Sequence, residues 1–484
     1  MDFVVEMLIA PLVLILMLFD FFNSKWECWF RLNIEGPEPN IICGNIGSVA
    51  LGRISFVEMV NKFYREWRAE PYFGIFVWRT PVLIINDLNV VKYILLDNAK
   101  LFATPKLVIG RGIIHQNSYK SCGTIDHSKV LETVLTSEKV RDMFDLVIRS
   151  TNGRQETLNK IIKGKGVVDC SQFAEYFTTE ILIHCVFGVD GNSPMESEKI
   201  RTIIRGLCGP RERYLYPRKL CVILRVICCH LGVKENAKKW EFFVNLIREK
   251  IKHREERNIV CPDFIGVLQD LKSRTHGDNL EWTDDCFLAS EAIAFLITSY
   301  NSSVLLITAV LYELSINQEV EKRLRTEIRE TLKFYNESNC NVLDRMEYIS
   351  MVLAETLRKH PLRPLLKRKL NENIQIEKSQ MKMPRNTRII IPVSSIHHDE
   401  KYYPEPNTFS PERFSIEEIN RRNSMTFLPY DGGATSSLGE RVGIRITKLA
   451  LIFLLKSFRL NPTKINYHSY LKFQKVPVDL IPSE

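Results

Sequence analysis

The residues with the most obvious chemical use stand in a loop, Phe427–Gly439, which combines an aromatic side chain, adjacent glycines and the serines Ser436 and Ser437. The hydroxyl of Ser437 is a weak metal ligand, because a serine side chain is rarely ionised near neutral pH. Serine is also a favoured helix N-cap, so the two serines could equally begin the helix that follows the loop. The last cysteine in the chain is Cys340, so no thiol close in sequence to Ser437 could act as a metal ligand in its place.

A second candidate site lies in the long apolar segment Thr283–Asn317, which is predicted to be a helix with Thr283 as its N-cap. Two polar residues, Asn301 and Ser302, interrupt this segment. Ser302 supplies a hydroxyl, whereas the Asn301 amide cannot hold or pass a proton as a carboxylate does. The alternative interpretation is structural, with Asn301 as a satisfied polar group at a kink that neighbouring serines ease.

Charged residues at helical spacing form a third candidate. Glu355 and Arg358 stand one helical turn apart, where an i,i+3 ion pair forms naturally, although many surface helices carry such a pair. Arg413 is a further basic residue downstream. The adjacent His397 and His398 are expected in a loop, too far in sequence from the serine loop to act as metal ligands in its place.

Composition excludes several classes of protein. The 45% hydrophobic content is typical of a globular protein, and the length permits one large domain or about three smaller ones. The 12 cysteines lack zinc-site spacing, which argues against zinc and a dense disulfide framework and favours reduced thiols in a cytosol-facing protein. A net charge of +9 is too mild and too dispersed for nucleic acid, so a membrane surface or an acidic protein is the expected partner.

The pattern of apolar residues predicts a mainly α-helical chain with a smaller β-rich part. Two β-rich runs, 72–78 and 81–86, lie on either side of Arg79-Thr80 and predict a hairpin. Further strands are expected at Lys382–Ile391 and Val476–Ile481. Helices are expected at Asn89–Asp97, Glu138–Ile162, Gln172–Phe187, Met195–Leu207, Lys234–Glu255, Pro262–Ser273, Thr283–Asn317 and Gln318–Tyr335.

The N-terminal stretch Phe3–Phe22 is almost wholly apolar and is about as long as a helix that spans the hydrocarbon core of a bilayer. Asp2 and Glu6 argue against a cleaved signal peptide, which would carry basic residues there. Lys25 and Arg31 follow the stretch and predict that the rest of the chain lies on the cytoplasmic side. A helix lying in the membrane interface is the alternative, because the strictly apolar core is short.

Two later segments bear on the same membrane. Pro37 and Pro39 stiffen the chain into an extended connector. The segment Tyr214–Val233 is unusually apolar but also carries basic residues, so it is either part of the core or a loop that enters the membrane interface.

The loop Phe427–Gly439 resembles the haem-ligand loop of the cytochrome P-450 monooxygenases, in which Cys-x-Gly opens a helix. Together with further motifs, the resemblance covers nearly the whole chain and is greatest to the insect microsomal detoxification group. It implies the cytochrome P-450 fold with its long central helix. A membrane anchor is implied at 1–24, a basic, proline-containing hinge at 25–40 and the catalytic-type domain at 41–484. The other matching motifs are Val310–Ser315, Glu355–Arg358, His397–Asp399, Tyr402–Pro404 and Pro411–Phe414.

The resemblance also implies a function. A protein of this family is an oxidoreductase: a haem b-dependent monooxygenase of small lipophilic compounds, held by a single N-terminal anchor on the cytoplasmic face of the endoplasmic reticulum membrane. An NADPH-dependent P-450 reductase would supply electrons at a basic face. By the same resemblance, Glu355, Arg358 and Arg413 correspond to a buried structural cluster. Arg368 falls at or near a position that binds a haem propionate.

Four departures from the family pattern face that one cofactor. Ser437 replaces the cysteine whose thiolate binds the iron and favours O–O cleavage. Thr435 and the segment Thr124–Ser128 stand where the family has residues that contact the propionates. Asn301 and Ser302 stand at the acid–alcohol pair that relays protons to iron-bound oxygen, and Asn301 lacks the acid.

Three hypotheses follow from this combination. The chain is a monooxygenase despite the departures, or a catalytically inactive P-450 scaffold that binds a lipophile or regulates a partner, or the product of a decaying gene. The four departures favour the second and third hypotheses, because they touch cofactor chemistry. The retained folding motifs argue against the third.

Overall fold

The computed structural model describes residues 27–40, 43–103, 137–151, 167–188, 200–204, 241–274, 285–335, 341–376, 381–430, 438–462 and 477–482. Several sequence-based predictions fall outside these residues. They are the anchor at 1–24, the segment Thr124–Ser128, the apolar stretch Tyr214–Val233, and the loop residues Thr435 and Ser437.

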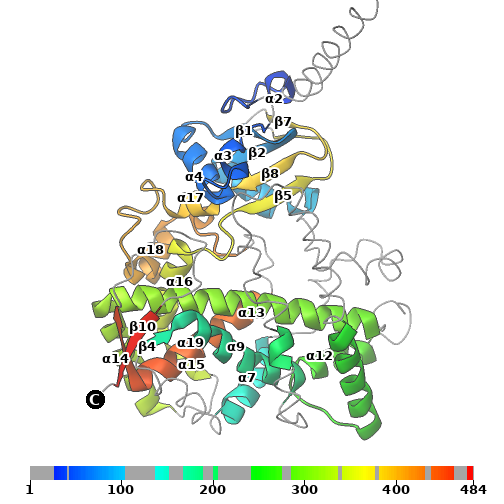
Figure 1. Ribbon diagram of the computed structural model, residues 1–484, viewed down its shortest axis with the longest axis vertical. Coiled ribbons are helices and arrows are strands. Elements are labelled where there is room, and N and C mark those ends of the chain that lie inside the picture. Colours follow the sequence, from blue (N-terminus) through cyan, green and yellow to red (C-terminus); the bar gives the residue numbers. More distant parts are fainter. Residues whose placement is uncertain are drawn as a thin grey trace, which may run out of the picture.

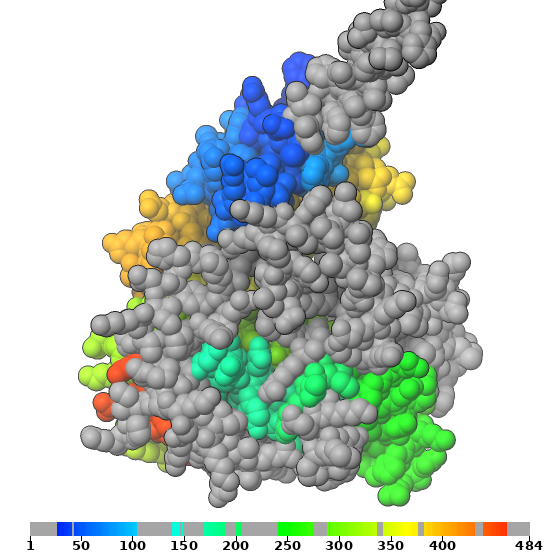
Figure 2. Space-filling model, viewed as in Figure 1, coloured from blue at the N-terminus to red at the C-terminus, as the bar shows by residue number. Residues whose placement is uncertain are grey.

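The molecule has a β-rich end and a larger helical end, with α16 (Glu347–Lys359) and α18 (Ile416–Arg421) drawn between them (Figure 1). Figure 2 shows the same arrangement on the surface, with the N-terminal residues (blue) at one end and the segment around 241–274 (green) at the other. The chain is therefore mainly α-helical with a smaller β-rich part, as the sequence predicts.

The main sheet has five strands in the order β1-β2-β8-β5-β3. Strands β1 and β2 form an antiparallel hairpin that pairs Tyr72 with Ile85, while β2 and β8 are parallel and pair Val82 with Arg388. The hairpin turn is Trp78-Arg79 rather than Arg79-Thr80, and Trp78 has a φ of 55°, which is uncommon for a bulky residue. The bounds are β1 Tyr72–Val77, β2 Thr80–Ile85, β3 Phe102–Ala103, β5 Leu366–Leu370 and β8 Arg388–Ile391.

Both faces of this sheet are buried, because alternate residues of β2 point to opposite sides. Leu83 and Ile85 belong to one apolar cluster, together with Ile389 and Ile391 of β8. Val82 and Ile84 belong to a second cluster, together with Met59 and Val60 of α4 (Phe56–Glu66). Ser55 starts α4 with a capping box, in which it and Glu58 bond each other's backbone N–H groups.

The helical end is built around α13 (Asp285–Ile316), which is 32 residues long. Its largest contacts are with α19 (Leu438–Ser457) and α9 (Cys170–Phe187), and residues of all three share one apolar core. Helix α9 is apolar on nearly every side and is almost wholly buried, whereas α13 leaves Asn301 and Leu305 exposed. Figure 1 shows α13 crossing the whole width of this end, with α9 and α19 drawn beneath it.

The remaining helices confirm most of the predicted segments within the described residues. The segment Asn89–Asp97 begins as an α-helix and continues as a π-helix, and residues 241–257 and 200–204 are helical. The other helices are α2 Glu27–Arg31, α3 Gly47–Ala50, α5 Leu88–Lys92, η1 Tyr93–Asp97, η2 Ala99–Leu101, α7 Ser137–Thr151, α12 Phe264–Arg274, α14 Gln318–Phe334, α15 Asn341–Arg345, α17 Val393–His397, η6 Pro411–Phe414 and η7 Ser424–Thr426.

Two smaller sheets complete the structure. The first is antiparallel, with β10 (Pro477–Pro482) between β4 (Val167–Asp169) and β9 (Phe458–Pro462). The second pairs β6 (Ile374–Ile376) with β7 (Met381–Met383). The predicted strand Lys382–Ile391 is thus two strands, β7 and β8, which lie in different sheets.

Among the described helices, the stretch Glu291–Ile316 of α13 is the one that is long and apolar enough to cross a membrane. About two thirds of its most apolar window is buried inside the molecule (67%). It is therefore the core helix of the helical end.

Candidate functional site

The predicted Glu-Arg-Arg residues meet in the interior. Arg358 binds Glu355 through two parallel hydrogen bonds, Nε to Oε2 at 2.7 Å and Nη2 to Oε1 at 2.8 Å, and both side chains are fully buried. Arg413 approaches the same carboxylate with its Nε 3.6 Å from Oε1. The backbone N–H of Ser410 donates to Oε1 at 3.0 Å. Buried charges need such saturation with partners, since an unpaired one is costly.

His397 connects this cluster to the chain that enters the loop Phe427–Gly439. It ends the short helix α17, so the loop prediction is wrong for His397, whereas His398 lies in the turn that follows. Arg358 Nη1 donates to the backbone oxygen of His397 at 2.9 Å, and His397 Nδ1 faces the oxygen of Arg358 at 3.1 Å. On the other side of the ring, the N–H of Leu428 donates to Nε2 at 2.9 Å.

These bonds define the protonation state of His397. Nε2 accepts a hydrogen bond, so the proton is on Nδ1 and the ring is neutral. Burial, together with a smaller contribution from the neighbouring His398, lowers the pKa of His397 to about 3. Phe427 stacks on the ring with centroids 5.6 Å apart. The imidazole therefore acts as a neutral connector and is not available as a metal ligand.

Tyr403 forms a second connection between the cluster and the loop entry. The guanidinium groups of Arg358 and Arg422 lie 5.2 Å and 4.5 Å from its ring centroid. Its hydroxyl donates to the backbone oxygen of Thr426 at 3.2 Å. The segment that enters the loop is thus fixed by buried hydrogen bonds to α16, α17 and the residues after them.

The two polar residues of the central helix do not act as a pair. The Asn301 side chain is exposed, whereas Ser302 is buried. The Ser302 hydroxyl lies 2.8 Å from the oxygen of Thr298, 3.1 Å from that of Ser299 and 3.2 Å from that of Gly439 on α19. Its single proton is therefore shared among backbone carbonyl groups.

Beside Ser302, α13 and α19 are in direct contact. A methyl group added at Gly439 would lie 2.8 Å from Thr298 Cβ and 2.9 Å from the backbone nitrogen of Ser299. A methyl group added at Gly443 would overlap the Ser302 hydroxyl and lie 3.0 Å from its Cβ. Only glycine permits this separation, because real Cβ atoms do not approach other atoms so closely.

The last predicted site residue, Arg368, lies in the main sheet at the β-rich end of the molecule. It is a buried residue of β5, opposite Ile389 of β8, and its Nη1 donates to the oxygen of Lys367 at 3.0 Å. Asn301 and Ser302 are on α13 at the helical end. Within the described residues, no group of three or more His, Cys, Asp or Glu side chains is arranged to hold a metal ion.

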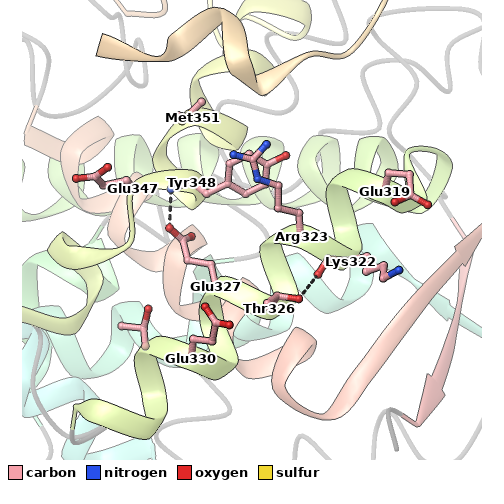
Figure 3. A pocket seen from close by; sticks show the side chains of 10 residues that line it. Glu319, Lys322, Arg323, Thr326, Glu327, Glu330, Glu347, Tyr348 and Met351 are labelled. Atoms are coloured by element: carbon pink, nitrogen blue, oxygen red, sulfur yellow. Dashed lines mark hydrogen bonds between the residues drawn. The ribbon is translucent and has the colours of Figure 1, made fainter. Parts of the chain in front are cut away.

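A polar cavity of about 580 Å³ lies between α14 and α16 (Figure 3). Arg323 lies over the ring of Tyr348, 4.0 Å from its centroid, and also binds Glu412 at 2.7 Å. The carboxylate of Glu327 accepts the N–H groups of Tyr348 and Ile349 at 2.7 Å and 2.9 Å. It therefore caps α16 from the neighbouring helix, which is a structural role.

Sequence reasoning missed two kinds of residue here. His397 was placed in a loop, because a helix of five residues is too short to show periodicity. The close contact of Gly439 and Gly443 had a usable signal: the two glycines stand four residues apart and so share one face of a helix.

Comparison with known proteins gives one consistent result. The model of the family described as Cytochrome P-450 matches residues 34–471. Probable cytochrome P-450 6a13 of Drosophila melanogaster is 29% identical over 452 residues, which cover 90% of this chain and 88% of the relative. Cytochrome P-450 6B7 of Helicoverpa armigera is 26% identical over 469 residues, 93% of this chain and 92% of the relative. Cytochrome P-450 6j1 of Blattella germanica is 27% identical over 463 residues, which cover 92% of this chain and 90% of the relative.

Proposed function

This chain belongs to the cytochrome P-450 family, and from that premise we propose that it is a monooxygenase-like protein that has lost haem-thiolate oxygen activation. The family implies haem as cofactor and a reductase as the source of electrons. We propose that the retained scaffold holds a small lipophilic ligand, or a protein partner, without oxidising it.

The observation that carries this proposal is that the Asn301 side chain is exposed while the Ser302 hydroxyl is buried against backbone oxygens. Proton delivery needs an acid and a hydroxyl within hydrogen-bond reach of the same proton. Here the amide is exposed and cannot supply a proton, while the hydroxyl is buried against three backbone oxygens. Position 301 therefore has no acid to supply a proton, and the Ser302 hydroxyl is bonded to backbone oxygens.

The donor chemistry at the ligand position supports the same proposal. A serine at 437 offers a neutral alcohol where the family's chemistry needs a thiolate. The described residues also leave no space for a flat macrocycle between Ser302 and Gly439, whose hydroxyl and carbonyl oxygens are 3.2 Å apart. Haem held as in the family does not fit these residues.

We further propose the family's membrane placement for this chain: an anchor at 1–24, a hinge at 25–40 and the remaining domain at the cytoplasmic face of the endoplasmic reticulum. The end of the hinge supports part of this. Its backbone oxygens at Pro37 and Glu38 accept the Asn45 amide at 2.9 Å and 3.2 Å, and the Gly74 N–H donates to Glu35 at 2.8 Å. The connector therefore leaves the domain in a fixed direction beside β1.

A turnover assay tests the proposal. The full-length protein, supplied with haemin during expression, is mixed with NADPH, P-450 reductase and a panel of lipophilic compounds. The same assay is run on Ser437→Cys and on Ser437→Cys combined with Asn301→Asp. We expect no substrate-dependent product from the parent. Product from the parent above the reductase-only background would show that oxygen activation is retained and the proposal is wrong.

A further inference from the structure

We infer that α13 and α19 close on each other through a small-residue seam, and that this seam occupies the place of haem between the two helices. The seam consists of Thr298, Ser299, Ser302 and Ser303 on α13, and Gly439 and Gly443 on α19. The chain would then fold and remain stable without its family's cofactor. This goes beyond the proposed loss of activity, because a protein can bind haem and still be inactive.

The geometry of the seam is that of a completed helix–helix contact. Gly439 and Gly443 are one helical turn apart, and a Cβ added at either one would meet atoms of α13 within 3 Å. Small residues at such positions let two helix backbones approach to atomic contact. The Ser302 hydroxyl also lies 3.2 Å from the oxygen of Gly439, which places polar atoms of the two helices in contact across the interface.

Three of the four hydroxyl groups on the α13 side, those of Thr298, Ser302 and Ser303, donate to carbonyl oxygens of their own helix. Thr298 Oγ1 donates to the oxygen of Ala294 at 2.8 Å, and Ser303 Oγ donates to the oxygen of Ser299 at 2.6 Å. On α19, Thr447 Oγ1 donates to the oxygen of Gly443 at 2.8 Å. Thr298, Ser303 and Thr447 therefore enter the interface with their hydroxyl groups bonded, whereas the buried hydroxyl of Ser299 has no hydrogen-bond partner among the described residues.

A flat cofactor needs more space than the seam leaves. Two layers of atoms on either side of a planar ring must stand roughly 7 Å apart, since each makes van der Waals contact at about 3.5 Å. By family resemblance, haem would be held between the loop that precedes Gly439 and the pair Asn301-Ser302. At that level the facing atoms of α13 and α19 are about 3 Å apart, as Ser302 and Gly439 show.

Apolar packing continues the contact along both helices. Val442 and Ile446 of α19 are fully buried, and Leu306 and Ile307 of α13 are almost or fully buried. All four belong to one apolar core. The interface thus has an apolar continuation beyond the small residues. Separating the helices to admit a ring would expose this surface, so haem binding must compete with a contact that is already formed.

Glycine substitutions in haem-free protein test the seam. Gly439→Ala places a methyl group against Thr298 Cβ and the Ser299 backbone, so we expect the thermal unfolding midpoint to fall by roughly 2–6 °C. Gly47→Ala is the matched control, because a methyl group there meets nothing within 4 Å. An unchanged midpoint for Gly439→Ala would mean that the helices stand apart in solution, and the inference would be overturned.

A double substitution checks the contact atom by atom. Gly443→Ala alone overlaps the Ser302 hydroxyl, and Ser302→Ala removes that oxygen. We expect the double variant to be more stable than the sum of the two single changes predicts. Strictly additive midpoints would contradict direct contact between the two positions.

Haemin titration separates this inference from the proposed function. Haemin is added to the haem-free parent and to Ser437→Cys, followed by absorbance and by the unfolding midpoint. We expect no saturable one-to-one uptake and no rise in midpoint in either protein. Saturable uptake that raises the midpoint would overturn the seam, while absence of product in the turnover assay would still leave the proposed function standing.

Discussion

Nε2 of His397 accepts a hydrogen bond from the backbone N–H of Leu428, a residue 31 positions later in the chain. The same ring bonds the backbone of Arg358, so one neutral imidazole joins α16, α17 and the segment that enters the loop Phe427–Gly439. This role depends on the ring staying unprotonated, because a protonated Nε2 would face a donor.

His397 should therefore make the protein acid-sensitive. Burial lowers the pKa of His397 to about 3 and that of His398 to about 4, below the usual value of 6.5. Between these values the unfolded state binds more protons, so stability falls as pH drops from 6.5 and is fully present only above it. Each histidine contributes a slope of about 1.4 kcal/mol per pH unit.

Urea unfolding between pH 4.5 and 6.5 measures this slope, because most carboxylates titrate below about pH 4.5. His397→Asn keeps a donor that can face the oxygen of Arg358 but removes the titration. We expect the variant to be less stable at pH 7. We also expect its stability to change less with pH, by about 1.4 kcal/mol per pH unit, which corresponds to one proton. An unchanged slope would mean that His397 titrates normally in the folded protein.

The buried ion pair should be worth far more than an exposed one. Arg358→Ala leaves the fully buried Glu355 carboxylate without its bidentate partner, and we expect a loss of about 3–5 kcal/mol in unfolding free energy. Arg421→Ala removes an exposed pair with Glu418, and we expect a change within about 1 kcal/mol. Chemical unfolding of both variants decides this, and equal losses would contradict the ranking.

The cap that α14 supplies to α16 gives a sharper prediction. Glu327→Gln keeps the size of the side chain but removes the charge that accepts the N–H group of Tyr348 (Figure 3) and that of Ile349. We expect a loss of about 0.5–2 kcal/mol. Glu330→Gln, one turn along and exposed at the same cavity, is the control and should be neutral. A neutral Glu327→Gln would mean that water caps α16 equally well.

A side chain at Gly74 should detach the N-terminal segment 27–40 from strand β1, because Gly74 contacts Trp29. A methyl group added at Gly74 would lie 2.6 Å from the ring of Trp29, whose Nε1 donates to the oxygen of Ile75 at 3.2 Å. We expect Gly74→Ala to speed proteolytic cleavage near residues 27–40, as Trp29→Ala should also do. Gly47→Ala should leave the cleavage rate unchanged, and equal rates in all variants would contradict this docking.

Periodicity predicted the helices and the first hairpin well, because α9, α13 and β2 carry long apolar patterns. It did not predict β5, whose sequence Leu-Lys-Arg-Lys-Leu has three basic residues among its five. This strand forms because Leu366, Arg368 and Leu370 alternate into the interior between β8 and β3. Such non-local pairing leaves little trace in the local sequence.

The candidate site was predicted in part. The spacing of Glu355 and Arg358 predicted their contact, because helix geometry alone brings residues i and i+3 together. The approach of Gly439 to Thr298 joins residues far apart in the chain. It depends on how α13 and α19 cross, which a single sequence does not specify.

The parallel pairing of β2 with β8 sets a late step in folding during synthesis. Strand β2 can pair with β8 only after Arg388, about 300 residues beyond Val82, has been synthesised. Until then the growing chain holds a hairpin with one long, apolar, unpaired edge, which is a template for aggregation. A polypeptide that stops before residue 388 would keep that edge exposed, so premature termination should yield material for degradation instead of a smaller stable protein.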